Sequence, residues 1–174
     1  MARFAIIFLV LVVSLFALEL VEPVRQAVIL PFTGFLATFS SAIMQIFDND
    51  VGSTKDVIHS LSTGQAVRIA AGCNGVEAVI VLFAAIFAFP SKFKHKILGF
   101  VLGFFGIQIL NVIRIISLYY LLQWDQKWFD WFHLYLWQAL IILDALIVWL
   151  IWLRYLPKNT PGNTQNDPDA KAIA

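Results

Sequence analysis

The only cysteine of this chain, Cys73, lies in the stretch Ala-Gly-Cys-Asn-Gly-Val-Glu-Ala at residues 71–78, where a polar loop passes into an apolar run. A helix that begins at Asn74 or Gly75 would place its exposed backbone N–H groups near the Cys73 sulfur. The positive partial charge at that end of a helix favours a thiolate over a thiol. Cys73 is therefore a candidate nucleophile, and an inert small residue is the alternative.

Two further side chains, Arg114 and His133, have the chemistry that a cysteine nucleophile needs. A histidine can shuttle the proton, and a guanidinium can stabilise the thiolate or the oxyanion of a tetrahedral intermediate. An arginine costs about 2.5–3.5 kcal/mol at the centre of a bilayer, so Arg114 is expected to face the bundle interior and meet an anion or a polar cavity. We predict Cys73, Arg114 and His133 as the catalytic set.

Four polar residues are candidates for substrate binding or for support of this set: Asn74, Glu77, Asn111 and Arg68. Glu77 lies one helical turn from the cysteine, so it could orient the histidine or pair with the catalytic arginine. Asn111 lies one turn from that arginine and could bond the guanidinium or a substrate carbonyl. For both residues an ordinary polar contact between helices is the alternative. Arg68 is a competing guanidinium, or else a solvated residue on a strand.

Other chemistries find no support in the sequence. His59, His95 and His133 lack the spacing of metal ligands, and there is no His-Glu-x-x-His motif. A Gly-x-Ser-x-Gly nucleophile elbow is also missing. We therefore expect neither a metal nor a cofactor.

The composition places these residues in a membrane protein. Of the 174 residues 60% are hydrophobic and 13% are charged, and the mean hydropathy is +0.82. A soluble domain of this size could not cover so much apolar surface with so few charges. The net charge of +1 gives no indication of nucleic-acid binding, so the lipid bilayer is the expected environment.

The candidate spans are the apolar runs at residues 4–20, 76–89, 97–122 and 134–153. The first lacks a convincing cleavage site, which favours an uncleaved signal-anchor. Residues 24–47 are apolar but interrupted by Pro31 and Gly34, so they could span, re-enter or lie in the interface.

Two smaller patterns complete the predicted architecture. Residues 57–58 and 66–69 are strand-like pieces on either side of turn-forming residues, which predicts a small hairpin. Gly99, Gly103 and Gly106 share roughly one helix face and predict close helix contact.

Basic residues set the expected orientation, because they favour the cytoplasmic side. They are Arg3, the cluster at residues 92–96, Arg154 and Lys158. All lie inside only if residues 4–20 cross and residues 24–47 do not fully cross. The predicted fold is an all-α integral membrane protein, with about four transmembrane helices, an interfacial or re-entrant segment and a small outward hairpin. It forms one catalytic domain at residues 1–156 and a disordered cytoplasmic tail at residues 157–174.

This topology gathers the reactive residues at the outer face. Cys73 caps the outer end of the second span and His133 opens the last span from its outer end. Arg114 lies about two turns, or ~10 Å, below the outer end of the third. Residues 24–47 and the hairpin are expected to form a docking wall for a substrate.

Three features of this chain together resemble the exosortase/archaeosortase family. They are Cys73-Asn74-Gly75 at the start of a span, Asn111-x-x-Arg114-Ile115 near the outer end of the next, and His133 at the start of another. The resemblance covers residues 64–153 and is strongest to the short exosortase H subgroup. Many relatives have Ser or Thr where this chain has Asn74. In that family the corresponding Cys, Arg and His are the proposed active site.

The resemblance implies a membrane-embedded cysteine transpeptidase/protease. Its substrates would be secreted proteins with a C-terminal sorting signal: a short motif, one transmembrane helix and a basic end. It would cut near the motif at the periplasmic face of a bacterial inner membrane, hold the product as a thioester on Cys73 and transfer it to an unknown acceptor such as a lipid or glycan. Both termini would be cytoplasmic.

Two other classes remain open from the sequence. In a non-enzymatic bundle, a channel or assembly subunit, the glycines mediate packing and Arg114 pairs with Glu77 or Asp144. Asp144 has no place in the predicted mechanism. A thiol redox partner would need a resolving cysteine from another molecule, since this chain has no second one.

Overall fold

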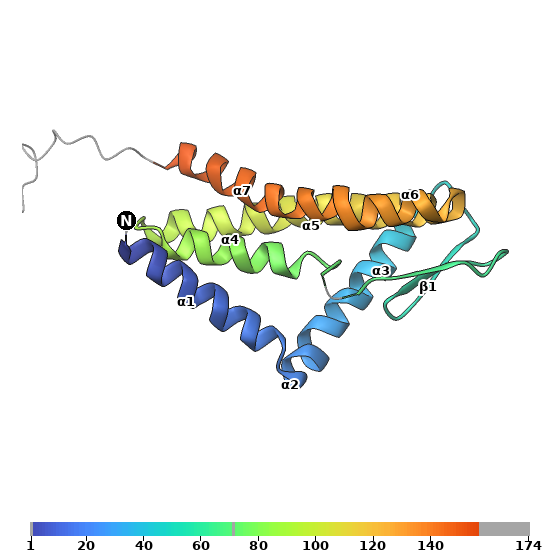
Figure 1. The fold of residues 1–174 in the computed structure, drawn as a ribbon, viewed down its shortest axis with the longest axis horizontal. Coiled ribbons are helices and arrows are strands. Elements are labelled where there is room, and N and C mark those ends of the chain that lie inside the picture. Colours follow the sequence, from blue (N-terminus) through green and yellow to red (C-terminus); the bar gives the residue numbers. More distant parts are fainter. Residues whose placement is uncertain (1, 71, 157–174) are drawn as a thin grey trace, which may run out of the picture.

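The computed structural model describes residues 2–70 and 72–156, and the predicted disordered tail at residues 157–174 lies outside the described residues. The chain is mostly helical, with a small sheet at one end of an elongated molecule (Figure 1). The elements are α1 (Ala2–Glu19), α2 (Glu22–Val24), the π-helical segment η1 (Arg25–Ile29), α3 (Leu30–Met44), β1 (Val51–Thr54), β2 (Val57–Ser60), β3 (Ala66–Arg68), α4 (Val76–Ala88), α5 (Phe93–Trp124), α6 (Gln126–Trp131), the π-helical segment η2 (Phe132–Leu136) and α7 (Trp137–Tyr155).

In the described part of the chain four helical runs are long and apolar enough to cross a membrane, which confirms the predicted fold class. They are Ala2–Glu19, Glu22–Met44, Phe93–Trp124 and Gln126–Tyr155. This set differs from the predicted one. The helix Val76–Ala88 has 13 residues and is shorter than the ~20 that a full span needs, whereas Glu22–Met44 has 23.

Pro31 does not break the helical run Glu22–Met44, because the π-helical turn η1 comes directly before it. The N–H of Leu30 bonds to the carbonyl of Arg25, five residues back. A proline has no backbone N–H to donate to the helical hydrogen bonds, and the wider π-helical turn accommodates the missing bond. In Figure 1, α1 and α3 form a V with α2 at its vertex, and α3 continues toward the end that holds the sheet.

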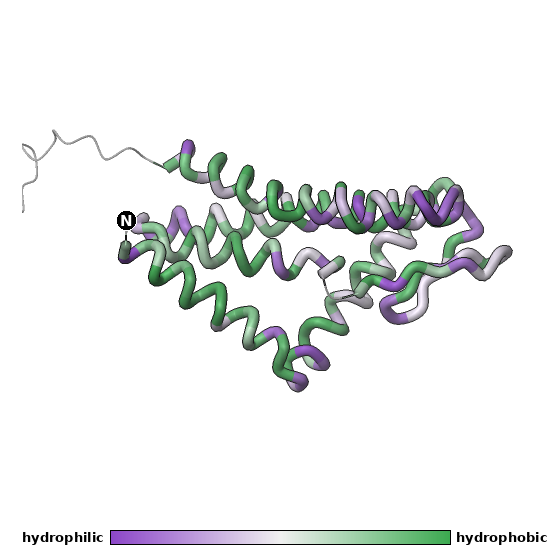
Figure 2. Tube along the Cα trace, viewed as in Figure 1, coloured by the Kyte–Doolittle hydropathy of each residue, from purple (hydrophilic) through white to green (hydrophobic). Residues whose placement is uncertain are grey.

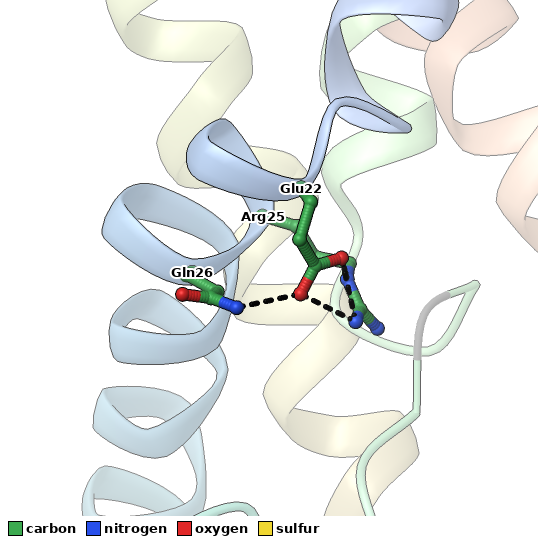
Figure 3. Close-up of polar contacts among 3 residues, drawn as sticks. All are labelled: Glu22, Arg25 and Gln26. Atoms are coloured by element: carbon green, nitrogen blue, oxygen red, sulfur yellow. Dashed lines mark hydrogen bonds and ion pairs between the residues drawn. The ribbon is translucent and has the colours of Figure 1, made fainter.

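A polar cluster marks the bend between α1 and α3 (Figure 3). Arg25 donates to both carboxylate oxygens of Glu22 at 2.9 and 3.0 Å, and Gln26 donates to Glu22 at 2.7 Å. Helix α1 therefore runs between Arg3 at its start and this cluster just after its end. That separation of about 28 Å matches the ~30 Å hydrocarbon core. Figure 2 shows α1 as largely hydrophobic between these polar limits.

The starts of α1 and α5 and the end of α7 lie together at the opposite end of the molecule from the sheet (Figure 1). The ring centroid of Phe4 is 6.2 Å from that of Phe89, and the indole N–H of Trp152 donates to the carbonyl of His95 at 3.0 Å. These segments carry the basic residues Arg3, Lys92, Lys94, Lys96 and Arg154. The basic residues of the described chain that were expected on one side of the membrane thus share one end of the structure.

Helices α5 and α7 are longer than a bilayer requires. The 32 residues of α5 extend about 48 Å at ~1.5 Å per residue. With α6 and η2, α7 forms a helical run of 30 residues. Both runs are therefore longer than a ~30 Å hydrocarbon core, and α5 contacts α3 and strand β3.

The sheet has three antiparallel strands in the order β1-β2-β3. The predicted hairpin is the β2–β3 pair, in which Ile58 pairs with Val67. Strand β1 was not predicted, because its sequence Val-Gly-Ser-Thr contains only one strongly apolar residue. Ile58 packs with Leu36 of α3 and Ile115 of α5 in one hydrophobic cluster, which fixes the sheet to the helices.

Close helix contact is confirmed at two of the three glycines in the predicted stripe. A Cβ at Gly99 would lie 2.1 Å from Cδ1 of Trp152, and one at Gly103 would lie 2.5 Å from Cδ2 of Leu82. A Cβ at Gly106 would have no atom within 4 Å. Gly106 therefore does not mediate packing within the described chain.

We expect Gly99→Ala to destabilise the protein by about 1–3 kcal/mol, because the new methyl group would collide with a packed indole ring. Gly106→Ala is the matched control, since its methyl group enters open space. Thermal unfolding in detergent measures the effect. Equal melting temperatures for the two variants would contradict this account of the packing.

Candidate active site

The loop before α4 is held in place by Asn74, which is fully buried. Its Oδ1 accepts a hydrogen bond from the N–H of Val76 at 3.0 Å, and its Nδ2 donates to Oγ1 of Thr33 at 3.3 Å. Asn74 thus caps the first N–H of α4 and ties the loop to α3. The helix begins at Val76, not at Asn74 or Gly75 as expected. Asn74 is absent from the lining of the cavity described below, so its observed contacts are structural.

Gly75 is required by both backbone conformation and space. Its φ is +75°, in the left-handed region that residues with a Cβ rarely adopt. A Cβ there would lie 3.1 Å from Nε2 of Gln108 and 3.3 Å from Cγ of Asn111. The loop therefore approaches α5 with no room for a side chain.

Arg114 is 1% exposed and reaches from α5 to this loop. Its Nη2 donates to the Cys73 sulfur at 3.5 Å, and its Nη1 donates to the carbonyl of Gly72 at 3.4 Å. Arg114 lies 21 residues after the start of α5, or about 31 Å along the helix. The guanidinium is thus roughly one hydrocarbon thickness from the basic end of the molecule.

His133 lies in η2, where its ring stacks on Phe129 with the centroids 5.5 Å apart and the planes inclined by 5°. Its Nδ1 is buried and has no hydrogen-bond partner among the described residues. The stacking fixes the plane of the imidazole ring. Nδ1 therefore lacks a hydrogen-bond partner that would determine which ring nitrogen carries the proton.

Cys73, Arg114 and His133 line one cavity of about 450 Å³. One wall is Ala66–Arg68, which is β3, and apolar residues of α5 form another. Helix α3 does not line it, so of the two segments expected as a docking wall only the hairpin contributes. The complete lining is Gln65, Ala66, Val67, Arg68, Ile69, Ala70, Cys73, Arg114, Ile115, Leu118, Leu122, Gln126, Phe129 and His133.

Arg68 lines the same cavity but remains solvated. Its side chain is 71% exposed, and its Nε lies 3.4 Å from Oδ2 of Asp56. In contrast to Arg114, Arg68 has no hydrogen bond to the cysteine loop in the described structure. The buried guanidinium, and not the strand one, is therefore the partner of the sulfur.

Burial raises the pKa of the Cys73 thiol above its ordinary value. The Arg114 guanidinium opposes this shift, and the Glu77 carboxylate adds to it. The expectation that the helix start favours a thiolate is wrong for this structure, because the loss of solvation outweighs the nearby positive charge. A raised pKa favours the thiol over the thiolate, so a base would have to remove the proton before this sulfur could act as a nucleophile.

Glu77 has a different contact from the two that were expected. Its Oε1 accepts a hydrogen bond from the N–H of Gly72 at 2.6 Å. Among the described residues it forms neither an ion pair with Arg114 nor a hydrogen bond with His133. Asp144 likewise makes no ion pair there, so the bundle hypothesis in which Arg114 pairs with either carboxylate is not supported.

Asn111 is 5% exposed, and its Nδ2 donates to Oε1 of Gln108 at 3.4 Å. It lines a second, smaller cavity with Arg114 and does not line the larger one. Sequence reasoning missed Phe129 and Gln126, which line the larger cavity. The position of Phe129, four residues before His133 on a helical run, was the one available signal.

We expect the alkylation rate of Cys73 to rise with pH through a midpoint above that of an ordinary cysteine. Glu77→Gln should move this midpoint to lower pH, because it removes a negative charge and keeps the oxygen that accepts from Gly72. Arg114→Gln should move it to higher pH. The control is Glu22→Gln in the exposed cluster at the bend, and a Glu77→Gln midpoint equal to that of wild type would refute the electrostatic account.

Gly75→Ala should lower the melting temperature more than Gly64→Ala. Both positions have a positive φ, but only at Gly75 would a methyl group meet neighbouring side chains. The expected loss is about 1–3 kcal/mol beyond the backbone strain that the two variants share. Thermal unfolding tests this prediction, and equal losses would show that α5 does not confine the loop.

Comparison with known proteins gives one match. The sequence model of a family described as transmembrane exosortase matches residues 1–150. No curated protein and no solved structure matches the chain. The match includes Cys73, Arg114 and His133, and it extends to residue 1, whereas the sequence motifs suggested a resemblance over residues 64–153.

Proposed function

The chain belongs to the transmembrane exosortase family, and from this membership we propose that it is a multi-pass membrane transpeptidase that uses Cys73 as its nucleophile. The family supports a role in protein sorting at a membrane. One observation supports the assignment to particular residues. The buried guanidinium of Arg114 lies 3.5 Å from the Cys73 sulfur, in a cavity that His133 also lines.

The first step of the proposed reaction is activation of the thiol. His133 takes the proton of Cys73, and Arg114 stabilises the thiolate that forms. The thiolate attacks the carbon of the scissile peptide carbonyl, and the oxyanion that develops is stabilised by the same guanidinium. Because burial raises the pKa of the Cys73 thiol, the reactive thiolate forms when the base accepts its proton.

The second step releases the C-terminal part of the substrate. The C–N bond breaks, the amine leaves with the proton that His133 returns, and the N-terminal part stays on Cys73 as a thioester. An acceptor nucleophile then attacks the thioester carbon and passes its proton to His133. Cys73 leaves as a thiolate and takes that proton, so the enzyme returns to its starting state.

The proposed substrates are secreted proteins with a C-terminal signal of motif, transmembrane helix and basic end. The acceptor is proposed to be a nucleophile, such as a lipid or a glycan. The larger cavity has a hydrophobic wall from Ile115, Leu118 and Leu122, and polar side chains from the sheet side. Such a lining suits an extended peptide close to the membrane boundary.

We further propose a bacterial inner membrane, with the cysteine on the periplasmic side and both termini in the cytoplasm. The clustering of basic residues at the far end of the molecule supports this orientation. So does the position of Arg114, about 31 Å from that end along α5. Residues 1–156 then act as a single catalytic domain.

Co-expression with a tagged secreted protein that bears such a C-terminal signal tests the proposal. Cys73→Ala should abolish processing, and Arg114→Lys should lower its rate by about 100-fold or more. A lysine ammonium is a point charge and cannot reach the carbonyl of Gly72 and the sulfur together in a planar fork. Arg25→Lys at the exposed bend is the matched control.

If Cys73→Ala processes the substrate as well as wild type, the nucleophile assignment is wrong. If Arg114→Lys processes it at the rate of Arg25→Lys, the guanidinium is not part of the machinery. Immunoblotting of the tagged substrate over time measures both rates.

A further inference from the structure

Arg114 lines a second cavity in addition to the one that contains Cys73. This cavity has a volume of about 10 Å³ and lies where the start of α4 meets α5 and α7. The volume is close to the minimum that one water molecule occupies. Its lining is Gly75, Ala78, Ile107, Leu110, Asn111, Arg114, Trp137, Ile141 and Asp144.

Three of these residues carry a buried polar atom that has no partner among the described residues. They are Nε of Arg114, Oδ1 of Asn111 and Nε1 of Trp137. The fourth polar side chain of the lining, Asp144, makes no ion pair with any described residue. Native proteins leave few buried polar atoms unpaired, so several around one cavity point to a shared partner.

We propose that this cavity binds one water molecule, which connects Arg114 to Asn111, Trp137 and Asp144. The water accepts hydrogen bonds from the Nε–H of Arg114 and the Nε1–H of Trp137. It donates its own two protons to Oδ1 of Asn111 and to the carboxyl group of Asp144. Two donors and two acceptors satisfy the tetrahedral preference of water, and each buried atom gains the bond it lacks.

The inference deepens the proposed function and rests on it, because it makes Asn111, Trp137 and Asp144 positioning residues for Arg114. Both Nη atoms of Arg114 bond the cysteine loop at long distances of 3.4 and 3.5 Å. Nε lies in the same rigid plane as these two nitrogens. A partner at Nε therefore fixes the orientation of the fork that faces Cys73.

The site also accounts for two ionisable side chains inside the helical bundle. A buried arginine is tolerated when an anion or a polar network compensates it. Glu77 is occupied by the N–H of Gly72, and Asp144 is not within ion-pair distance of Arg114. A bridging water lets the Asp144 carboxyl group act on the guanidinium from that distance.

The test compares two pairs of variants by the pH midpoint of Cys73 alkylation and by substrate processing. Trp137→Phe removes one donor and changes no charge. Trp149→Phe is its control, because that indole is on the same helix and also has a buried, unpartnered Nε1, but it does not line the cavity. Asp144→Asn and Asp144→Leu both remove the charge, and only the asparagine retains an oxygen that accepts from water.

We expect Trp137→Phe to move the Cys73 midpoint to higher pH, in the same direction as Arg114→Gln and by less, while Trp149→Phe leaves it unchanged. Asp144→Leu should have a higher midpoint than Asp144→Asn and process substrate at least ~10-fold more slowly. In an Arg114→Gln background Trp137→Phe should add no further shift, and Asp144→Leu and Asp144→Asn should have equal midpoints. Glu77, Arg68 and His133 are unchanged in all these variants.

The inference is overturned if Trp137→Phe behaves like Trp149→Phe, or if Asp144→Leu matches Asp144→Asn. It is also overturned if the Trp137→Phe shift or the difference between the two Asp144 variants persists in the Arg114→Gln background, since the effect would then not act through the guanidinium. Alkylation of Cys73 needs no turnover. A failed processing assay with the expected midpoints would therefore refute the transpeptidase and leave the water site standing.

Discussion

The contact between the Arg114 guanidinium and the loop that carries Cys73 is the constraint on which the site depends. It joins the third long helix to the start of α4 through hydrogen bonds to the sulfur and to the carbonyl of Gly72. A buried guanidinium in a helical membrane bundle must be compensated, and the loop supplies a carbonyl and a polarisable sulfur. The contact that compensates the guanidinium is thus the same one that the proposed chemistry uses.

The rest of the fold serves to hold that contact at one level of the molecule. The short helix α4 begins where α5 is already about 31 Å from its basic end, so the loop meets α5 near its arginine. Asn74 anchors the loop to α3, and Gly75 lets it approach α5. The extra length of α5 supplies the apolar wall of the resulting cavity, and that of the α6–α7 run carries the histidine to it.

Prediction from sequence was most successful where a residue type is expensive in a membrane or where motifs recur in order. The predicted gathering of Cys73, Arg114 and His133 is found in the structure, and the family match agrees with the resemblance. Prediction from sequence was wrong about the expected preference for the Cys73 thiolate and about the partner of Glu77. Both depend on a balance of burial and short contacts, which helical spacing does not encode.

Sequence alone was enough to predict the membrane class, the helical architecture and the grouping of basic residues, and it supplied the candidate reactive side chains, whose catalytic roles stay a prediction. These follow from hydropathy, charge and residue chemistry, which are local properties of the chain. The packing of the helices was needed to show that α4 is short, that Asn74 is a cap and that Asp144 shares a cavity with Arg114. Those facts depend on which helices touch and at what depth, because burial and hydrogen-bond geometry arise only when distant segments pack together.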